Sequence, residues 1–233
     1  LRLRDQRHGD AAPLRAALHD RSRSVRNAAA YLLRARYREW PQSAWRQALS
    51  TKAEPAAEIP ALALAEHAEA EDVPRLAAWL SHPSARLRSL ALHSLIRLGV
   101  PDLGRHLKHA MADPAPRVVR EATRAYGKGS ERLDAADLGA AYAKANSSGK
   151  VALLNASRAL GKWDGLRFLL AHATEADAEL FANFTPHLFR WEGNANSIFT
   201  PLPPEQRDEL LRLLKMAQQK HPNGAWGRLQ ELI

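Results

Sequence analysis

Two histidines offer the chain's best opportunity for metal chemistry. His106 and His109 are three positions apart, so on a helix both imidazoles would lie on one face, where they could bind a zinc ion. No third ligand stands at a typical spacing from them, and Arg105 and Lys108 would repel a cation. We therefore interpret both histidines as exposed to solvent, and we expect no metal and no cofactor.

Catalytic chemistry has equally little support. The carboxylates between Glu66 and Asp72 could hold a divalent cation, but the stretch lacks the glycine and the alternating Asp/Asn of a calcium loop, which favours a solvated helix end. Ser22, Ser24 and Ser84 stand at predicted helix starts, where serine acts as a cap. The chain contains no cysteine and no phosphate-binding loop, GxSxG or HExxH motif. We therefore expect no catalytic residues and a protein that is not an enzyme.

The elements that position these residues repeat at a fixed offset of 31 positions. Taking a turn residue as zero, the corresponding residues of copies one to four are Asp20, Thr51, His82 and Asp113. Six positions earlier stand Leu14, Trp45, Leu76 and Leu107, and thirteen positions later Leu33, Leu64, Leu95 and Tyr126. Such a period indicates stacked units that bury a shared core, and the four-residue spacing within each copy predicts two helices.

The predicted fold is therefore all-α: an α-solenoid of about six helix pairs over residues 1–191, followed by a C-terminal part, residues 192–233. In that part we expect an irregular loop at 192–204 and then capping helices, the first of them from Pro204 to about Lys220. Pro60 predicts a kink or a late helix start in copy two, and residues 147–149 are expected to lengthen a turn in the fifth pair. Trp191, at the edge of the loop, is the one tryptophan that the pattern does not assign to the core. The chain starts with Leu-Arg-Leu-Arg, so we expect it to be part of something longer.

Two segments carry a family resemblance. Asp20-Arg-Ser-Arg-Ser-Val25-Arg26 and Asp113-Pro-Ala-Pro-Arg-Val118 resemble HEAT repeats of the short bacterial type, also called PBS-lyase-type repeats. The resemblance covers roughly residues 10–190 and implies a right-handed superhelix whose second helices line the concave side. It also implies that Asp20 and Arg26 form ion pairs bridging adjacent turns. Members of this family act in scaffolding, DNA-lesion excision or bilin attachment, so the resemblance does not specify a chemistry.

The residues expected to bind a partner follow from the repeat register. Positions five, nine and thirteen of each copy should face the core, so those between them should face outwards on the concave side. These outward residues are Arg23, Asn27, Tyr31, Arg34, Glu54, Glu58, Ser89, His93, Arg120 and Arg124. From copy one to copy four the predicted face is basic, acidic, neutral and basic.

This charge pattern separates two hypotheses of function. Alternating sign suits a protein or peptide partner with complementary patches, so the leading hypothesis is a protein-binding scaffold module. The net charge of +9 and the pI near 10.2 favour the alternative, a DNA-binding protein resembling the HEAT-like alkylpurine glycosylases. Such a groove needs a continuous positive stripe, which acidic copy two interrupts. No run of 18 apolar residues exists, so we expect no membrane span, and the cytoplasm is the default location over the periplasm.

Overall fold

The computed structural model describes residues 10–51, 57–129, 131–195, 200–224, 226 and 228–233. All regular structure in these residues is helical, without a strand, which confirms the all-α prediction. None of the helices described is both long enough and apolar enough to cross a membrane. The chain divides into two compact units, Leu1–Val100 and Pro101–Ile233, which are described separately below. The predicted division at residue 191 stays a prediction.

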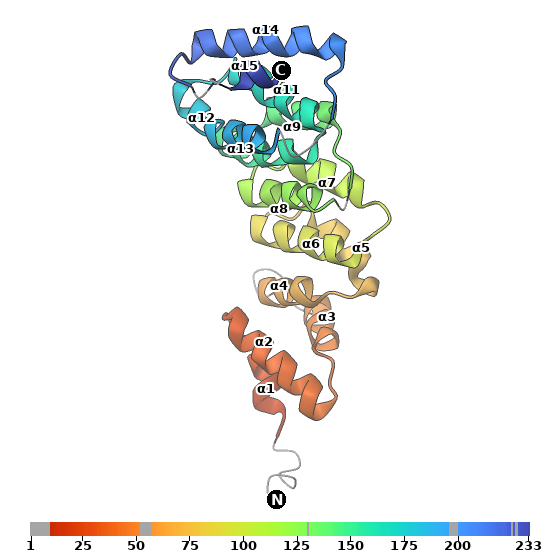
Figure 1. Cartoon of the computed structure of the whole chain (residues 1–233). Coiled ribbons are helices and arrows are strands. Elements are labelled where there is room, and N and C mark those ends of the chain that lie inside the picture. Colours follow the sequence, from red (N-terminus) through yellow and green to blue (C-terminus); the bar gives the residue numbers. More distant parts are fainter. Residues whose placement is uncertain (1–9, 52–56, 130, 196–199, 225, 227) are drawn as a thin grey trace, which may run out of the picture. The chain divides into compact units, whose positions relative to one another are not determined.

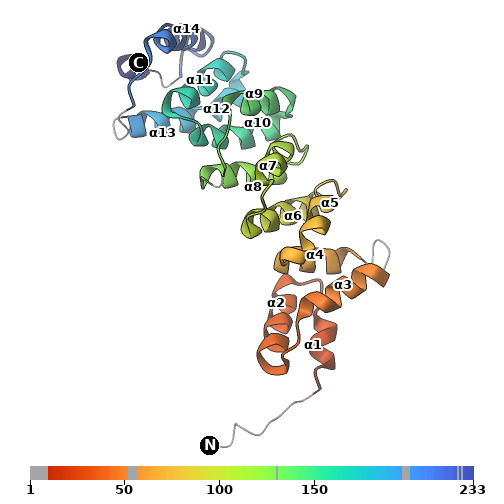
Figure 2. The same cartoon turned by 90° about the vertical axis from the view of Figure 1, so that its right-hand side faces the viewer.

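The first unit contains the two helices that the register predicts for each of its copies (Figure 1). Its elements are α1 (Ala12–Ala17), α2 (Arg23–Leu32), a π-helical turn (Leu33–Tyr37), α3 (Pro41–Thr51), α4 (Glu58–His67), a 3-10 turn (Ala70–Asp72), α5 (Val73–Trp79) and α6 (Ala85–Leu98). Helix α1 packs on α2, α3 on α4 and α5 on α6, and α4 also packs on α6. Figure 2 shows the pairing of α1 with α2 from a second direction.

The core of this unit uses the repeat positions. Leu33, Leu64 and Leu95 are buried, as is Trp45, and in α4 the whole run from residue 60 to residue 65 is buried because the helix lies between α3 and α6. Leu14 is only partly buried, and Val25 is 40% exposed although the register assigned it to the core. That prediction was wrong because α2 turns the neighbouring arginine inwards instead.

The helix that contains Pro60 starts late, as predicted. Helix α4 begins at Glu58, so Pro60 occupies the third helical position. An amide at this position has no carbonyl partner within the helix, so a proline costs no hydrogen bond there.

The second unit continues with helix pairs and ends in a covering helix. Its elements are α7 (Leu103–Met111), α8 (Pro116–Gly127), α9 (Ala135–Lys144), α10 (Ser147–Leu154), a 3-10 turn (Asn155–Ala159), α11 (Lys162–Ala173), α12 (Ala178–Ala182), α13 (Thr185–Ala195), α14 (Pro204–Lys220) and α15 (Leu229–Leu232). Helix α14 has the predicted bounds and packs on α11 and α15 (Figure 1). Its apolar stripe, which includes Leu210 and Leu214, is buried.

Three expectations for this unit need correction. Residues 147–149 form the first turn of α10 rather than a longer loop, because the Asn146 side chain accepts a hydrogen bond from the Gly149 amide at 2.8 Å. The spacing of Leu180, Phe184 and Leu188 predicts one continuous second helix for the sixth pair, but this segment is split into α12 and α13 near Asn183. Helix α13 also runs to Ala195, so residues 192–195 are helical rather than part of an irregular loop. Residues 196–199 of that predicted loop lie outside the described residues.

Candidate interaction surface

A buried arginine ties α2 to α4. The Arg26 side chain is 1% exposed, and its Nη1 donates to the backbone carbonyls of Asp20 at 3.0 Å and Arg21 at 3.1 Å. Its Nη2 lies 3.3 Å from Oε2 of Glu66, 40 positions along the chain. The Asp20 carboxylate instead accepts the Ser22 amide at 2.7 Å. The prediction of an Asp20–Arg26 ion pair was therefore wrong, because the acid that pairs with Arg26 is Glu66. Arg26 does connect two copies.

Glu66 is shared with a predicted binding residue. Nε of Arg23 lies 3.3 Å from Oε1 of Glu66, whose side chain is 3% exposed, whereas most of the Arg23 side chain remains exposed. One carboxylate therefore receives two guanidinium groups from α2. Glu66 therefore partly neutralises the positive charge that Arg23 presents to a partner.

Arg46 contacts the other three carboxylates of the acidic stretch. Its guanidinium binds the Asp72 carboxylate through two hydrogen bonds of 2.7 and 2.8 Å and also contacts Glu69 and Glu71. Burial acts to raise the pKa of Asp72, but hydrogen bonds from Arg46 and from the Glu69 amide outweigh it, so this pKa is lowered. The Asp72 hydrogen bond also raises the pKa of Arg46. The expectation of a solvated helix end was therefore wrong for Glu66 and Asp72, whose buried carboxylates are held in ion pairs, whereas Glu69 and Glu71 are exposed.

His67 lies beneath the predicted face and was not singled out in the sequence. Its Nε2 is 2.9 Å from Oδ1 of Asn27, so Nε2 carries the hydrogen atom and donates a hydrogen bond to this amide oxygen. The imidazole stacks on the buried Trp45 ring with the centroids 5.2 Å apart. Burial, followed by the charge of Arg34, lowers the pKa of His67. Asn27 is thereby held against the core by a neutral histidine, and only part of it faces solvent.

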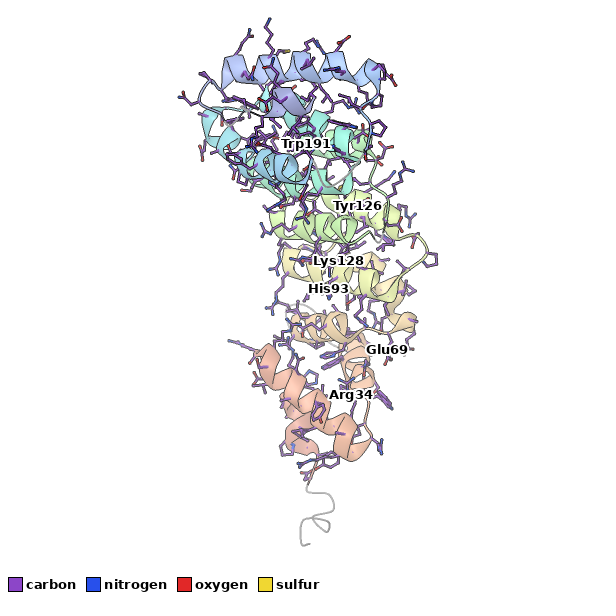
Figure 3. All side chains as sticks on the ribbon, in the orientation of Figure 1. Arg34, Glu69, His93, Tyr126, Lys128 and Trp191 are labelled. Atoms are coloured by element: carbon purple, nitrogen blue, oxygen red, sulfur yellow. The ribbon has the colours of Figure 1, made fainter. Side chains whose placement is uncertain are left out.

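The most exposed aromatic side chains of the first unit lie together, one in the last turn of α2 and one just after the π-helical turn. Tyr31 is 67% and Trp40 64% exposed, and both line a depression of about 310 Å³ whose other lining residues are Arg34, Ala35 and Arg38. We call these five residues the aromatic–arginine patch. The repeat register predicted Tyr31 and Arg34 as binding residues, and Arg34 is labelled in Figure 3. It did not predict Arg38, and the expectation that Trp40 belongs to the core was wrong, because Trp40 follows the regular part of the copy.

The backbone beneath the patch is strained. Arg38 has φ 57° in the left-handed region, where a non-glycine residue costs roughly 1–2 kcal/mol. The Glu39 amide then bonds the Leu33 carbonyl at 3.2 Å and closes the π-helical turn. After α6 the equivalent left-handed position is Gly99. Single π-helical turns and left-handed non-glycine residues are both concentrated at functional sites.

The other predicted binding residues lie on three further helices. Glu58 of α4 and His93 of α6 are exposed, and Ser89 of α6 is half-buried. In the second unit, Arg120 and Arg124 are exposed on α8, with Nη1 of Arg124 2.7 Å from a carboxylate oxygen of Glu121. Glu54 lies outside the described residues.

The histidines of α7 separate. His106 is buried, with Nε2 3.3 Å from the Asp102 carboxylate, whereas His109 is exposed. The expectation of solvent exposure was wrong for His106, because it lies on the same buried face of α7 as Leu103 and Leu107.

Comparisons with known proteins found no relative of this chain. No family model matches the chain, and neither the curated proteins nor the solved structures gave a match. The function is therefore argued from the surface of the chain itself.

Proposed function

We propose that the chain is a non-enzymatic protein-binding module and that the aromatic–arginine patch is its main contact site. The observation that supports this most directly is the exposure of Tyr31 and Trp40 beside Arg34 and Arg38. Tyrosine, tryptophan and arginine are the residue types that dominate binding energy in protein interfaces. Two large aromatic side chains that share one depression would bury a substantial apolar area against a partner.

The charge of the patch indicates the chemistry of the partner. Arg34 and Arg38 line the depression without an acidic residue among its described lining, and Arg36 is exposed nearby. The buried carboxylates of copy two are occupied by Arg26 and Arg46. A peptide segment that carries both acidic and apolar side chains would complement this surface.

The proposal extends to the arrangement of the helix pairs along the whole chain. We propose that the helix pairs continue as one right-handed HEAT-type α-solenoid, with α14 and α15 as its C-terminal cap. The 31-residue register and the burial of its repeat positions in each unit support this. Small-angle X-ray scattering tests it, because a continuous stack has a longer maximum dimension than two units folded against each other.

A pull-down from native lysate, compared with variants, tests the binding site. Tyr31→Ala and Trp40→Ala should each reduce the recovered partner, and Arg38→Glu should reduce it through charge. The matched control is Phe189→Ala, because Phe189 is a similarly exposed aromatic residue in the second unit. A partner retained equally by all three patch variants would reject the site.

Single-stranded nucleic acid is the second candidate ligand. The observation in its favour is that two carboxylates of acidic copy two, Glu66 and Asp72, are buried in ion pairs, although Glu58 stays exposed. Exposed Tyr31 and Trp40 rings beside arginines could also stack with bases. A salt titration of oligonucleotide binding, started at about 50 mM salt, distinguishes the two functions, since phosphate contacts strengthen as the salt concentration is lowered. No affinity there removes this candidate.

A further inference from the structure

A separate cavity of about 150 Å³ lies within the second unit. Its walls come from the 3-10 turn after α10, the first turns of α11 and the length of α13. Trp191 of α13, labelled in Figure 3, forms one wall. Leu160 and Leu169 supply aliphatic surface. All of these residues belong to one compact unit, so the cavity does not depend on the placement of the first unit.

The charged side chains that line this cavity are cationic. Arg158, Lys162 and Arg190 line it, and its described lining residues include no aspartate or glutamate. His187 also lines it, and the Nδ1 atom of this imidazole is buried without a hydrogen-bond partner among the described residues. Burial and then the charges of Arg190 and Arg158 lower the pKa of His187 to about 4. The charges of two guanidinium groups therefore favour the neutral form of the His187 imidazole. The described lining residues include no carboxylate that would offset these charges.

Hydrogen bonds fix the walls in place. Nε1 of Trp191 donates to the Lys162 carbonyl at 2.8 Å, and the Trp191 ring lies 5.6 Å from the Trp163 ring. The Lys162 ammonium donates to the Ala195 carbonyl at 2.7 Å, which connects the start of α11 to the end of α13. At Gly165 an added Cβ would meet the Ser157 carbonyl at 2.7 Å, so glycine allows α11 to pack closely on the 3-10 turn. The cavity is therefore preformed.

We propose that this cavity binds a small organic anion with a flat apolar body, of about the size of benzoate. Its volume is sufficient for a benzene ring. Trp191 and the leucines would contact the ring, and Arg158 and Arg190 would pair with the carboxylate, a geometry that arginine favours. Both arginines are exposed at the mouth of the cavity, so an anion can reach them from solvent. This site goes beyond the proposed function, since it would bind a small molecule and lies in the second unit.

Calorimetric titration with three probes tests the proposal. Benzoate should bind saturably, whereas benzamide, which has the same ring without the charge, should bind at least about tenfold more weakly. Inorganic phosphate, which has the charge without the ring, should also bind more weakly than benzoate. Benzamide or phosphate binding as tightly as benzoate would overturn the proposal. So would the absence of benzoate binding at about 10 mM, a concentration that detects even millimolar dissociation constants.

Variants locate the site. Arg190→Gln and Arg158→Gln should each weaken benzoate binding about tenfold, and both side chains are exposed enough to be replaced without unfolding the unit. Arg207→Gln is the matched control, because Arg207 is an exposed arginine of α14 outside the lining. Unchanged affinity in both cavity variants would place benzoate elsewhere and reject this site. Circular dichroism of each variant verifies that it is folded.

Discussion

Arg26 and Glu66 form an ion pair of 3.3 Å in which both side chains are almost inaccessible to solvent. The pair joins α2 to α4, although the residues are 40 positions apart. The arginine also donates to two backbone carbonyls, so most of its donors are used. Such a pair adds little net stability over an apolar replacement, but the loss of one member leaves a buried charge without a partner.

Glu66→Ala should therefore lower the free energy of unfolding by about 3–5 kcal/mol. Urea denaturation followed by circular dichroism measures this difference. Glu58→Ala is the control on the same helix, since Glu58 is exposed, and it should change stability by less than about 0.5 kcal/mol. The double variant Arg26→Leu/Glu66→Leu should recover much of the loss. Equal effects of the two single variants would contradict the buried pair.

Leu95→Ala should cost about 2–5 kcal/mol, the range for truncating a leucine in a packed core. Leu95 of α6 is completely buried, whereas Leu98 in the last turn of the same helix is half-buried. Leu98→Ala should therefore cost clearly less in the same urea measurement. A loss below about 0.5 kcal/mol at Leu95 would mean that the repeat register does not describe the core.

His187 makes stability depend on pH. Its folded-state pKa of about 4 lies below the value of about 6.5 expected in the unfolded chain. Between these values the unfolded state binds more protons, so stability is lost as the pH falls from about 6.5 towards 4. His187→Gln should therefore lose less stability than the wild type between pH 7 and pH 4.5 in thermal melts. His67 and His172 have pKa values lowered in the same direction, so the variant should retain part of the dependence. Identical pH profiles would contradict the lowered pKa.

Arg38→Gly should stabilise the fold and weaken partner binding. Glycine removes the strain at φ 57°, which corresponds to roughly 1 kcal/mol, and it deletes a guanidinium from the aromatic–arginine patch. Arg36→Gly is the control, because Arg36 is exposed inside the π-helical turn and glycine there should destabilise by about 1 kcal/mol. Melting temperature and partner recovery are measured together. A lower melting temperature for Arg38→Gly than for the wild type would reject the strain argument.

The sequence predicted the helices and most of the core because both depend on local spacing. Trp45, Leu76 and Leu95 lie at fixed positions of the 31-residue copies, and all three are buried. The helix from Pro204 to Lys220 could be read in the same way. The prediction for Val25 was wrong because the repeat pattern does not show that the neighbouring Arg26 forms a buried ion pair with Glu66.

The candidate site was predicted less completely, because it depends on contacts distant in the sequence. Nothing near Glu66 in the chain indicates that it binds Arg23 and Arg26, so the acidic stretch read as solvent-exposed. Trp40 and Arg38 follow the second helix of copy one, outside the positions that the register compares. The patch depends on the path of the backbone through the π-helical turn and the left-handed residue Arg38, which the register does not predict.

The ion pairs of the first unit also limit how freely its repeats can be exchanged. A deletion of 31 residues would preserve the phase of the apolar positions and would look harmless on the pattern alone. Removing the segment with Glu66, however, would leave Arg26 in the interior without a counterion, and a transplanted copy would need an acid at the same place. Copies one and two thus behave as a matched set, so shortening or shuffling this array requires cuts that keep the arginine and its glutamate together.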